Sequence, residues 1–362
     1  MNAAAKNYDG VNKYIRITDI DEASSTYTDK DIVSPDGVLT DNYLVNNRDI
    51  LLARTGASTG KSYLYKKSDG KLYYAGFLIR ANVTTHDPYF VFSQLHTHRY
   101  WRWVSIMSAR SGQPGINSQE YSSFPIYTTS IEEESKIAKL LSLLDERIAT
   151  QNKIIEDLKK LKSAIIDYAI NSLNTDFAKF GSLYEMAGEG GTPTTSNASF
   201  YDNGKIPFIK IDDLKQKYLI ENKDFITELG LRKSSAWLVP TSSILFSNGA
   251  TIGEITITTY PVCTKQGILG IVPKQNIDVE YLYYFMSSSY FKKAVSRIVT
   301  EGTMKTAYLK DINNILCPIP TKEKQQKIAQ MPSALNSKID LEQSILRLFY
   351  AQKQYLLRQM FI

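Results

Sequence analysis

The strongest constraint on the fold of this 362-residue chain is an internal repeat with an offset near 192 residues. Residues 15–20 resemble residues 209–214, and residues 52–60 resemble residues 245–253. Two further matches follow in the same order, residues 124–126 with 317–319 and residues 136–138 with 327–329. Solenoid repeats have periods of about 20 to 50 residues, so a period this long indicates a duplicated domain.

Each repeat divides into a mixed part and a helical part. Short β-like runs and Gly, Pro and Asn turns mark the mixed parts, residues 1–129 and 172–320. Ser130 followed by Glu133 predicts a capping box, and no Gly or Pro then occurs until Gly181. These features predict an α+β fold with two helices, residues 130–171 and 321–362. Pro332 is expected to break or kink the second helix near Met331.

The two predicted helices carry apolar residues spaced by threes and fours, and polar residues interrupt both series at equivalent positions. Gln151 and Lys162 interrupt the first helix, and Glu342 and Lys353 interrupt the second. In an antiparallel coiled coil the register that matches polar with polar residues pairs Lys162 with Glu342 and Gln151 with Lys353. The apolar partners in that register are Ile148 with Leu356, Ile155 with Phe349, Leu158 with Leu346, and Ile165 with Ile339.

This pattern predicts two duplicated domains joined by two long antiparallel helices, with pseudo-twofold symmetry. A helix of residues 130–171 would be about 60 Å long at about 1.5 Å per residue. The alternative is that each helix packs on its own domain. Two similar domains held at a fixed spacing suit a long, regular ligand, and double-stranded DNA with two half-sites is the leading hypothesis.

Composition excludes several classes of protein. No apolar run approaches the about 20 residues that a membrane-spanning helix requires, and the first residues lack the apolar core of a signal peptide. Two cysteines cannot build a disulfide framework, so we expect a reducing, cytoplasmic location without a membrane partner. The net charge of +6 permits nucleic-acid binding without establishing it.

Three motifs could indicate an enzyme, and each is better explained without catalysis. The glycine turn before Lys61 has three residues between Gly56 and Gly60, whereas a phosphate-binding loop needs four. Glu134 and Lys136 form a nuclease-like E-x-K pattern, but their place in a helix favours a solvated face. The three histidines, His86, His96 and His98, are expected to be surface or structural residues, with no metal site. We therefore expect a non-catalytic chain.

Basic, amide and hydroxyl side chains are the hypothesised DNA contacts, because such groups bind phosphates and base edges. Each is weighed against the simpler reading of a solvated surface residue. In the first repeat they are Arg16, Arg54, Lys61, Arg110 and Gln113; in the second they are Thr192, Lys210, Asn248, Lys292, Lys293 and Lys305.

The whole chain resembles the specificity (S) subunit of type I restriction–modification systems. The order, the duplication and the intervening helices carry the resemblance. The matching segments are residues 190–194, 206–214, 248–253, 281–285 and 318–320, with Glu323, Gln325 and Ile328, and helix residues 143–148 and 158–162.

The resemblance implies that residues 1–129 and 172–320 are target recognition domains that each read half of a bipartite DNA sequence. It implies that the helices set the gap and dock two methyltransferase subunits, with restriction (motor-nuclease) subunits completing a phage-defence complex. S-adenosylmethionine, ATP and Mg would then act in the partners, with no cofactor in this chain. Two alternatives stay open: a partner with fused methyltransferase and nuclease, and a coiled-coil scaffold that binds no DNA. The first repeat also lacks a counterpart of residues 177–199, so its domain is N-terminally short.

Overall fold

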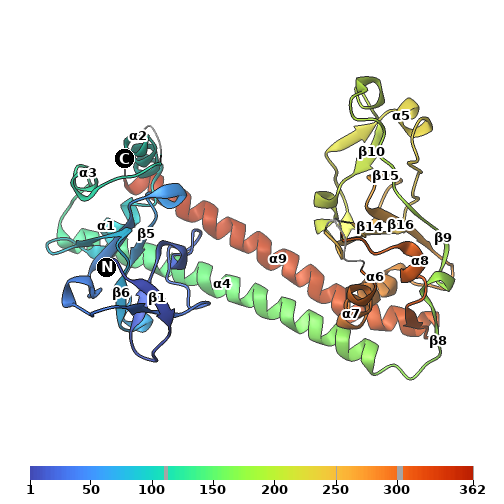
Figure 1. Ribbon diagram of the computed structural model, residues 1–362, viewed down its shortest axis with the longest axis horizontal. Coiled ribbons are helices and arrows are strands. Elements are labelled where there is room, and N and C mark those ends of the chain that lie inside the picture. Colours follow the sequence, from blue (N-terminus) through green and yellow to red (C-terminus); the bar gives the residue numbers. More distant parts are fainter. Residues whose placement is uncertain (110–112, 250, 300–304, 362) are drawn as a thin grey trace. The chain divides into compact units, whose positions relative to one another are not determined.

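The computed structural model describes residues 1–109, 113–249, 251–299 and 305–361, and it divides into two compact units. Unit 1 comprises Met1–Ile154 and Glu342–Ile362, and unit 2 comprises Ile155–Leu341. The division cuts both long helices, α4 (Ile131–Asn171) and α9 (Lys322–Met360), so each unit holds one mixed domain and a stretch of each helix (Figure 1).

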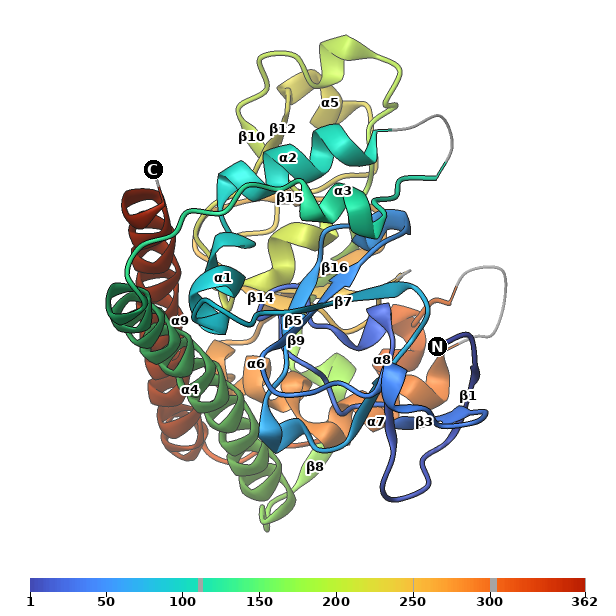
Figure 2. The same ribbon diagram turned by 90° about the vertical axis from the view of Figure 1, so that its left-hand side faces the viewer.

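Unit 1 is built around the antiparallel sheet β5-β4-β7, in which β4 (Asp49–Ala53) lies between β5 (Ser62–Leu64) and β7 (Leu78–Asn82). Alternate residues of β4 face two cores: Ile50 and Leu52 pack with the helices, whereas Leu51 packs with the remaining strands. The helices are α1 (Pro88–Gln94), α2 (His98–Ser108) and α3 (Ser118–Ser122) (Figure 2). The smaller sheets pair β1 (Ala4–Asn7) with β3 (Val33–Asp36), and β2 (Lys13–Ile15) with β6 (Leu72–Tyr74).

Unit 2 repeats this plan with a larger sheet, ordered β11-β14-β13-β16-β9. Its strands are β9 (Tyr184–Glu189), β11 (Tyr218–Leu219), β13 (Ile244–Ser247), β14 (Ile255–Thr258) and β16 (Ile268–Pro273). The other sheets join β10 (Ile206–Ile209) to β12 (Asp224–Ile226) and β15 (Cys263–Thr264), and β8 (Phe177–Lys179) to β17 (Leu316–Pro318). The helices are α5 (Glu228–Arg232), α6 (Val279–Ser287), α7 (Ser289–Ile298) and α8 (Leu309–Ile312).

Hydrogen bonds align the two repeats residue by residue. Gly60 N–H bonds Ala53 O in unit 1, and Gly253 N–H bonds Ser247 O in unit 2. Ala53 therefore corresponds to Ser247, and the next residues, Arg54 and Asn248, correspond to each other. The gap-free match of residues 52–60 with 245–253 is corrected by this pairing, because the turn in unit 1 is one residue longer.

The long helices run antiparallel within each unit. In unit 1, Leu357 and Phe361 near the end of the chain pack with Ala138 and Leu141 of α4. In unit 2, Ala329 near the start of α9 packs in the same core as Ile166 and Ile170 near the end of α4. The predicted pair of long antiparallel helices is confirmed.

The predicted register is wrong. Glu342 accepts hydrogen bonds from Gln151 and not from Lys162. Gln151 and Glu342 occupy equivalent positions of the two repeats, 191 residues apart, and contact each other. Lys353 donates to Asp145 Oδ1 at 2.6 Å, and Lys162 donates to Asn336 Oδ1 at 2.9 Å. The prediction matched only residues at the positions where the two helices face each other. Long lysine side chains can reach polar partners outside those positions. The apolar pairs assigned in the same register, among them Ile155 with Phe349 and Leu158 with Leu346, are therefore wrong as well.

Pro332 does not end the helix, because α9 continues through it. A proline inside a helix removes one backbone hydrogen bond and is tolerated where packing compensates. The neighbouring Ser333 accepts a hydrogen bond from Lys217 Nζ at 3.0 Å and donates to Glu280. Lys217 and Glu280 form a 3.1 Å ion pair, with the lysine side chain 5% exposed. These contacts fasten α9 to the mixed domain of unit 2 beside the proline.

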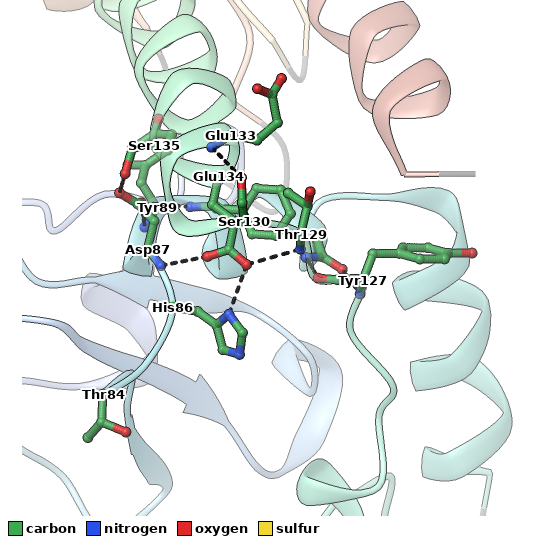
Figure 3. A network of polar contacts seen from close by, with 12 residues as sticks. Thr84, His86, Asp87, Tyr89, Tyr127, Thr129, Ser130, Glu133, Glu134 and Ser135 are labelled. Atoms are coloured by element: carbon green, nitrogen blue, oxygen red, sulfur yellow. Dashed lines mark hydrogen bonds and ion pairs between the residues drawn. The ribbon is translucent and has the colours of Figure 1, made fainter.

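The first turn of each long helix forms hydrogen bonds to the loop that leads into the short helices of its unit. In unit 1 the carboxylate of Glu134, 0% exposed, lies 2.8 Å from His86 Nδ1 and accepts the Asp87 N–H at 3.0 Å (Figure 3). In unit 2 the buried Gln325 accepts the Asp278 N–H at 2.8 Å and donates to two carbonyls. Asp87 and Asp278 are the N-caps of α1 and α6. The expectation of a solvated face at Glu134 is therefore wrong.

Candidate nucleic-acid interface

The turn after β4 in unit 1 displays Arg54 beside Gln113, which lies in the loop after α2. Backbone bonds fix Arg54: its N–H donates to Phe77 O, and its carbonyl accepts the Ile116 N–H. Both Arg54 and Gln113 are exposed. A Cβ placed on Gly56 would lie 3.3 Å from Gln113 Nε2, so the two loops are in contact. Arg54 forms no ion pair within the part of the chain that the structure describes, so its guanidinium remains available to a ligand.

The back of the same turn is closed by tyrosines. Tyr121 Oη donates to Ala53 O and accepts the Gly60 N–H, and Tyr100 Oη donates to Gly60 O. Burial raises the pKa of Tyr121 to about 12, so this hydroxyl stays protonated as a donor. Gly60 has φ +94, and a Cβ there would lie 2.7 Å from Val104 Cγ1, so glycine is required.

The corresponding turn in unit 2 presents a different chemistry. Asn248, at the place of Arg54, is 1% exposed and donates from Nδ2 to Ala307 O at 3.2 Å. Its Oδ1 is buried without a partner among the described residues. A cavity of about 290 Å³ lies beside this turn, with Ile252, Gly253 and Lys292 among its lining residues. Asn248 therefore supports the turn from inside and does not reach the surface.

Three of the hypothesised DNA contacts are paired inside their units. Arg16 forms ion pairs with Asp19 at 2.8 Å and Asp31 at 3.0 Å, and the hydrogen bonds to Asp19 raise its pKa. Lys210, its equivalent, pairs with Asp224 at 2.8 Å. Lys61 lies 3.3 Å from Glu22 and is only 18% exposed. A phosphate would have to compete with these carboxylates.

The remaining positions separate into helix and loop sites. Lys292 and Lys293 are exposed on α7, and Lys305 is exposed in a loop. Thr192 accepts the Gln266 N–H at 3.3 Å. Arg110 lies outside the described residues.

Sequence reasoning missed Arg102, which is exposed on α2. Helices α2 and α7 are equivalent, since the buried Tyr100 and Val104 match the buried Phe291 and Val295. This alignment places Arg102 at the position of Lys293. The internal repeat was the signal that could have found it.

The described residues were searched for metal-binding groups and reactive thiols. No group of three or more His, Cys, Asp and Glu residues there could hold a metal ion. Cys263 and Cys317 are free and buried, and burial raises the pKa of the Cys263 thiol to about 11. A search of the described helices found none with the length and apolar character needed to cross a membrane.

Comparison with known families now identifies the class. A family model described as type I restriction modification DNA specificity domain matches residues 1–160 and 174–348. The chain belongs to this family, with one copy of the domain in each repeat.

Individual relatives agree with this assignment. The chain is 33% identical over 171 residues to the MjaIX specificity subunit of Methanocaldococcus jannaschii, covering 46% of this chain and 38% of that one. The MjaVIII specificity subunit of the same organism is 24% identical, over 83% of this chain and 75% of its own length. The chain spans less than two thirds of the MjaIX subunit and of the putative MjaX subunit, of which it covers 65%.

Solved structures show the same fold. The S subunit of the type I restriction–modification system from M. genitalium superposes with a TM-score of 0.59 at 17% identity, over 98% of this chain and 89% of that chain. A chain solved in work on the complex assembly and conformational transition of the type I R-M system gives a TM-score of 0.61 at 15% identity, over 96% and 90%.

Proposed function

We propose that this chain is the DNA-recognition subunit of a type I restriction–modification complex and reads a bipartite target in double-stranded DNA. The observation that carries the proposal is the repeated display: each unit places a glycine turn beside a helix with an exposed basic residue, Arg102 in α2 or Lys293 in α7. Two such units suit two half-sites. The exposed side chains differ between them, so the two half-sites are expected to differ in sequence.

The chain acts without chemistry of its own. Methyl transfer and cleavage belong to two methyltransferase subunits and to restriction subunits, which would bind S-adenosylmethionine, ATP and Mg. Recognition and positioning are the roles that we assign to this chain.

The helices of unit 1 offer a surface for a partner subunit. A groove of about 650 Å³ runs between α4 and α9, lined by Leu140, Leu143, Leu144, Phe349 and Leu356. Leu140 and Leu143 are 46% and 43% exposed, and with the other apolar lining residues they form one contiguous apolar surface, the kind of surface that marks an interaction site. We assign this groove to a methyltransferase subunit, whose own apolar helices would cover it.

A domain exchange tests the recognition role. Replacing residues 172–320 by the corresponding domain of another specificity subunit should change one half of the methylated motif and leave the other half intact. A matched insertion of one heptad in both long helices should widen the gap between halves without changing either half. An active complex whose motif and gap stayed the same after both changes would contradict the proposal.

A further inference from the structure

A cavity of about 330 Å³ lies in unit 1 between the mixed domain and the two long helices. The mixed domain contributes the loop of residues 23–26 and the rings of Tyr89 and Phe92, and the long helices contribute Asp145 and Tyr350 among others. All of these residues belong to unit 1. A water molecule occupies about 30 Å³, so the cavity is large enough for a small organic ligand.

The internal repeat shows what fills the same place in unit 2. The offset of 191 residues between the N-cap residues of α1 and α6 also relates Tyr89 to Glu280 and Ser142 to Ser333. Lys217 reaches both residues of unit 2. Its Nζ lies 3.1 Å from a carboxylate oxygen of Glu280 and 3.0 Å from Ser333 Oγ. An ammonium group therefore occupies this place in the second repeat.

The ammonium of Lys217 is held in a closed, partly aromatic setting. Its side chain is 5% exposed. The Nζ lies 4.5 Å from the ring centroid of Tyr218 and 4.9 Å from that of Tyr284. Cations bind favourably over the faces of aromatic rings at such distances. A carboxylate, a hydroxyl and aromatic rings thus stabilise a cation that joins the mixed domain of unit 2 to α9.

Unit 1 has no such cation in its own sequence. Lys217 follows Lys210 at the same distance along the chain as Ala23 follows Arg16, the equivalent of Lys210. The loop residues that line the cavity, residues 23–26, include no basic side chain. The frame around the Lys217 ammonium is therefore kept in unit 1, whereas the lysine itself is replaced by alanine.

The cavity of unit 1 instead has two adjacent carboxylates. Asp145 and Glu146 line it at the positions where unit 2 has the neutral Asn336 and Ser337. Asp145 accepts a hydrogen bond from Lys353 Nζ at 2.6 Å. Glu146 forms no ion pair with any residue that the structure describes. Its carboxylate is therefore available to a cation in the cavity.

Two further groups affect the charge of the cavity. Lys66 lines it and is exposed, so water and salt screen its ammonium. His96 lies behind the loop, where its Nε2 is 3.0 Å from Ser25 Oγ. Burial lowers the pKa of His96 to about 4, so the ring is neutral near pH 7. Neither group therefore replaces the cation that unit 2 provides.

We propose that the cavity of unit 1 binds a small organic amine, whose ammonium group and alkyl chain take the place that the Lys217 side chain fills in unit 2. The ammonium would lie against the carboxylate of Glu146 and the hydroxyl of Ser142, and the alkyl chain along the rings of Tyr89 and Phe92. Such a ligand fastens the mixed domain of unit 1 to the long helices. The proposal does not depend on DNA recognition.

n-Butylammonium, which has the alkyl chain and ammonium of a lysine side chain, is the probe. Its binding to the intact chain is measured by saturation-transfer NMR, with n-butanol as the uncharged control. The net charge of +6 disfavours non-specific binding of a cation, so saturable binding reports a site. We expect saturable binding of the amine with a dissociation constant in the millimolar range, as suits so few atoms, and no saturable binding of the alcohol.

Two substitutions at the cavity distinguish a cation site from an anion site. Glu146→Gln should weaken binding of n-butylammonium at least about fivefold, because it removes the charged partner of the ammonium. Lys66→Gln is the matched control of opposite charge and should not weaken binding. The proposal is overturned if the parent chain does not bind the amine, if Glu146→Gln binds it as tightly as the parent, or if Lys66→Gln abolishes binding.

Restoring the missing lysine gives a test that needs no added ligand. Ala23→Lys should abolish binding of n-butylammonium and slow amide hydrogen exchange in residues 23–26, because its own ammonium would fill the cavity. Ala23→Met adds a side chain of similar length without the charge. Exchange should slow at least about fivefold more in the lysine variant than in the methionine variant, since only the lysine gains a charged partner. Equal exchange in the two variants would contradict the proposal.

Discussion

The two turns that follow β4 and β13 occupy the same place in their units but expose different side chains. Unit 1 presents the exposed Arg54, and tyrosine hydroxyls close the turn from behind. Unit 2 buries Asn248 at that position and leaves a cavity beside the turn, with basic residues on the neighbouring helix. Duplication has kept the backbone frame and changed the surface, as the proposed recognition of two different half-sites requires.

Glu134 and Gln325 hold a loop at the start of α4 and of α9, and we call them the clamp residues. These two residues also differ between the units. Glu134 receives hydrogen bonds from His86 and Asp87, whereas Gln325 both receives one and donates two. A carboxylate can only accept, so each clamp is matched to its own surroundings. The same helix-start position thus works with a charged group in one unit and a neutral one in the other.

Exchanging the clamp residues should have the largest effect. Glu134→Gln places an amide N–H₂ against donors, and Gln325→Glu places a carboxylate against the carbonyls of Asn276 and Pro320. Each change should lower the free energy of unfolding of its unit by about 2–4 kcal/mol, because buried polar groups lose their partners. Urea unfolding of each variant measures this. Two variants as stable as the parent would show that the clamps are not specific.

Acid should separate the two units next. Burial lowers the pKa of His96 to about 4, and its ring accepts from Ser25 and donates to Phe92 O in the neutral form. The unfolded chain binds this proton near pH 6.5, so unit 1 should lose about 1–3 kcal/mol as the pH falls from about 6.5 to about 4.

The control for this pH effect lies in the molecule itself. All three histidines precede Arg99, so unit 2 has none. Hydrogen exchange at pH 7 and pH 4.5 should report the loss in unit 1, and His96→Gln should reduce it. An equal loss in both units, unchanged by the substitution, would assign the acid effect to carboxylates instead.

Substitutions at the equivalent turn residues should act on different properties. Arg54→Ala should weaken DNA binding by the assembled complex about tenfold or more, since one Arg contact to a base is worth about 1–3 kcal/mol. Its free energy of unfolding should change by less than about 0.5 kcal/mol. Asn248→Ala should instead cost about 1–2 kcal/mol of stability through the lost bond to Ala307. If Arg54→Ala lowered stability and Asn248→Ala weakened DNA binding, the role proposed for each turn would be wrong.

The helix positions should give the smallest effect. Arg102→Ala and Lys293→Ala should each weaken binding only a few-fold, on specific and non-specific DNA alike. Each should reduce the slope of log affinity against log salt by about 1 if the residue contacts a phosphate. Titrations at several salt concentrations measure the slope, and an unchanged slope would remove that residue from the interface.

Sequence alone predicted the duplication, the α+β class and the two antiparallel helices, because repeated motifs and apolar spacing are local signals. It could not predict the register, since Lys162 and Lys353 reach Asn336 and Asp145 off the seam. It also misjudged Glu134, whose burial depends on a loop far away in the sequence. Arg16 and Lys210 carry charges that suggest DNA contacts, but carboxylates supplied by the fold pair with both.

The most direct test of the central claim is a map of methylated bases in cells that express the partner subunits, with and without this chain. We expect that one split motif, two short halves around a fixed gap, is methylated only when the chain is present. If cells with and without the chain had the same set of methylated motifs, and the purified complex did not bind DNA, the proposed recognition role would be wrong.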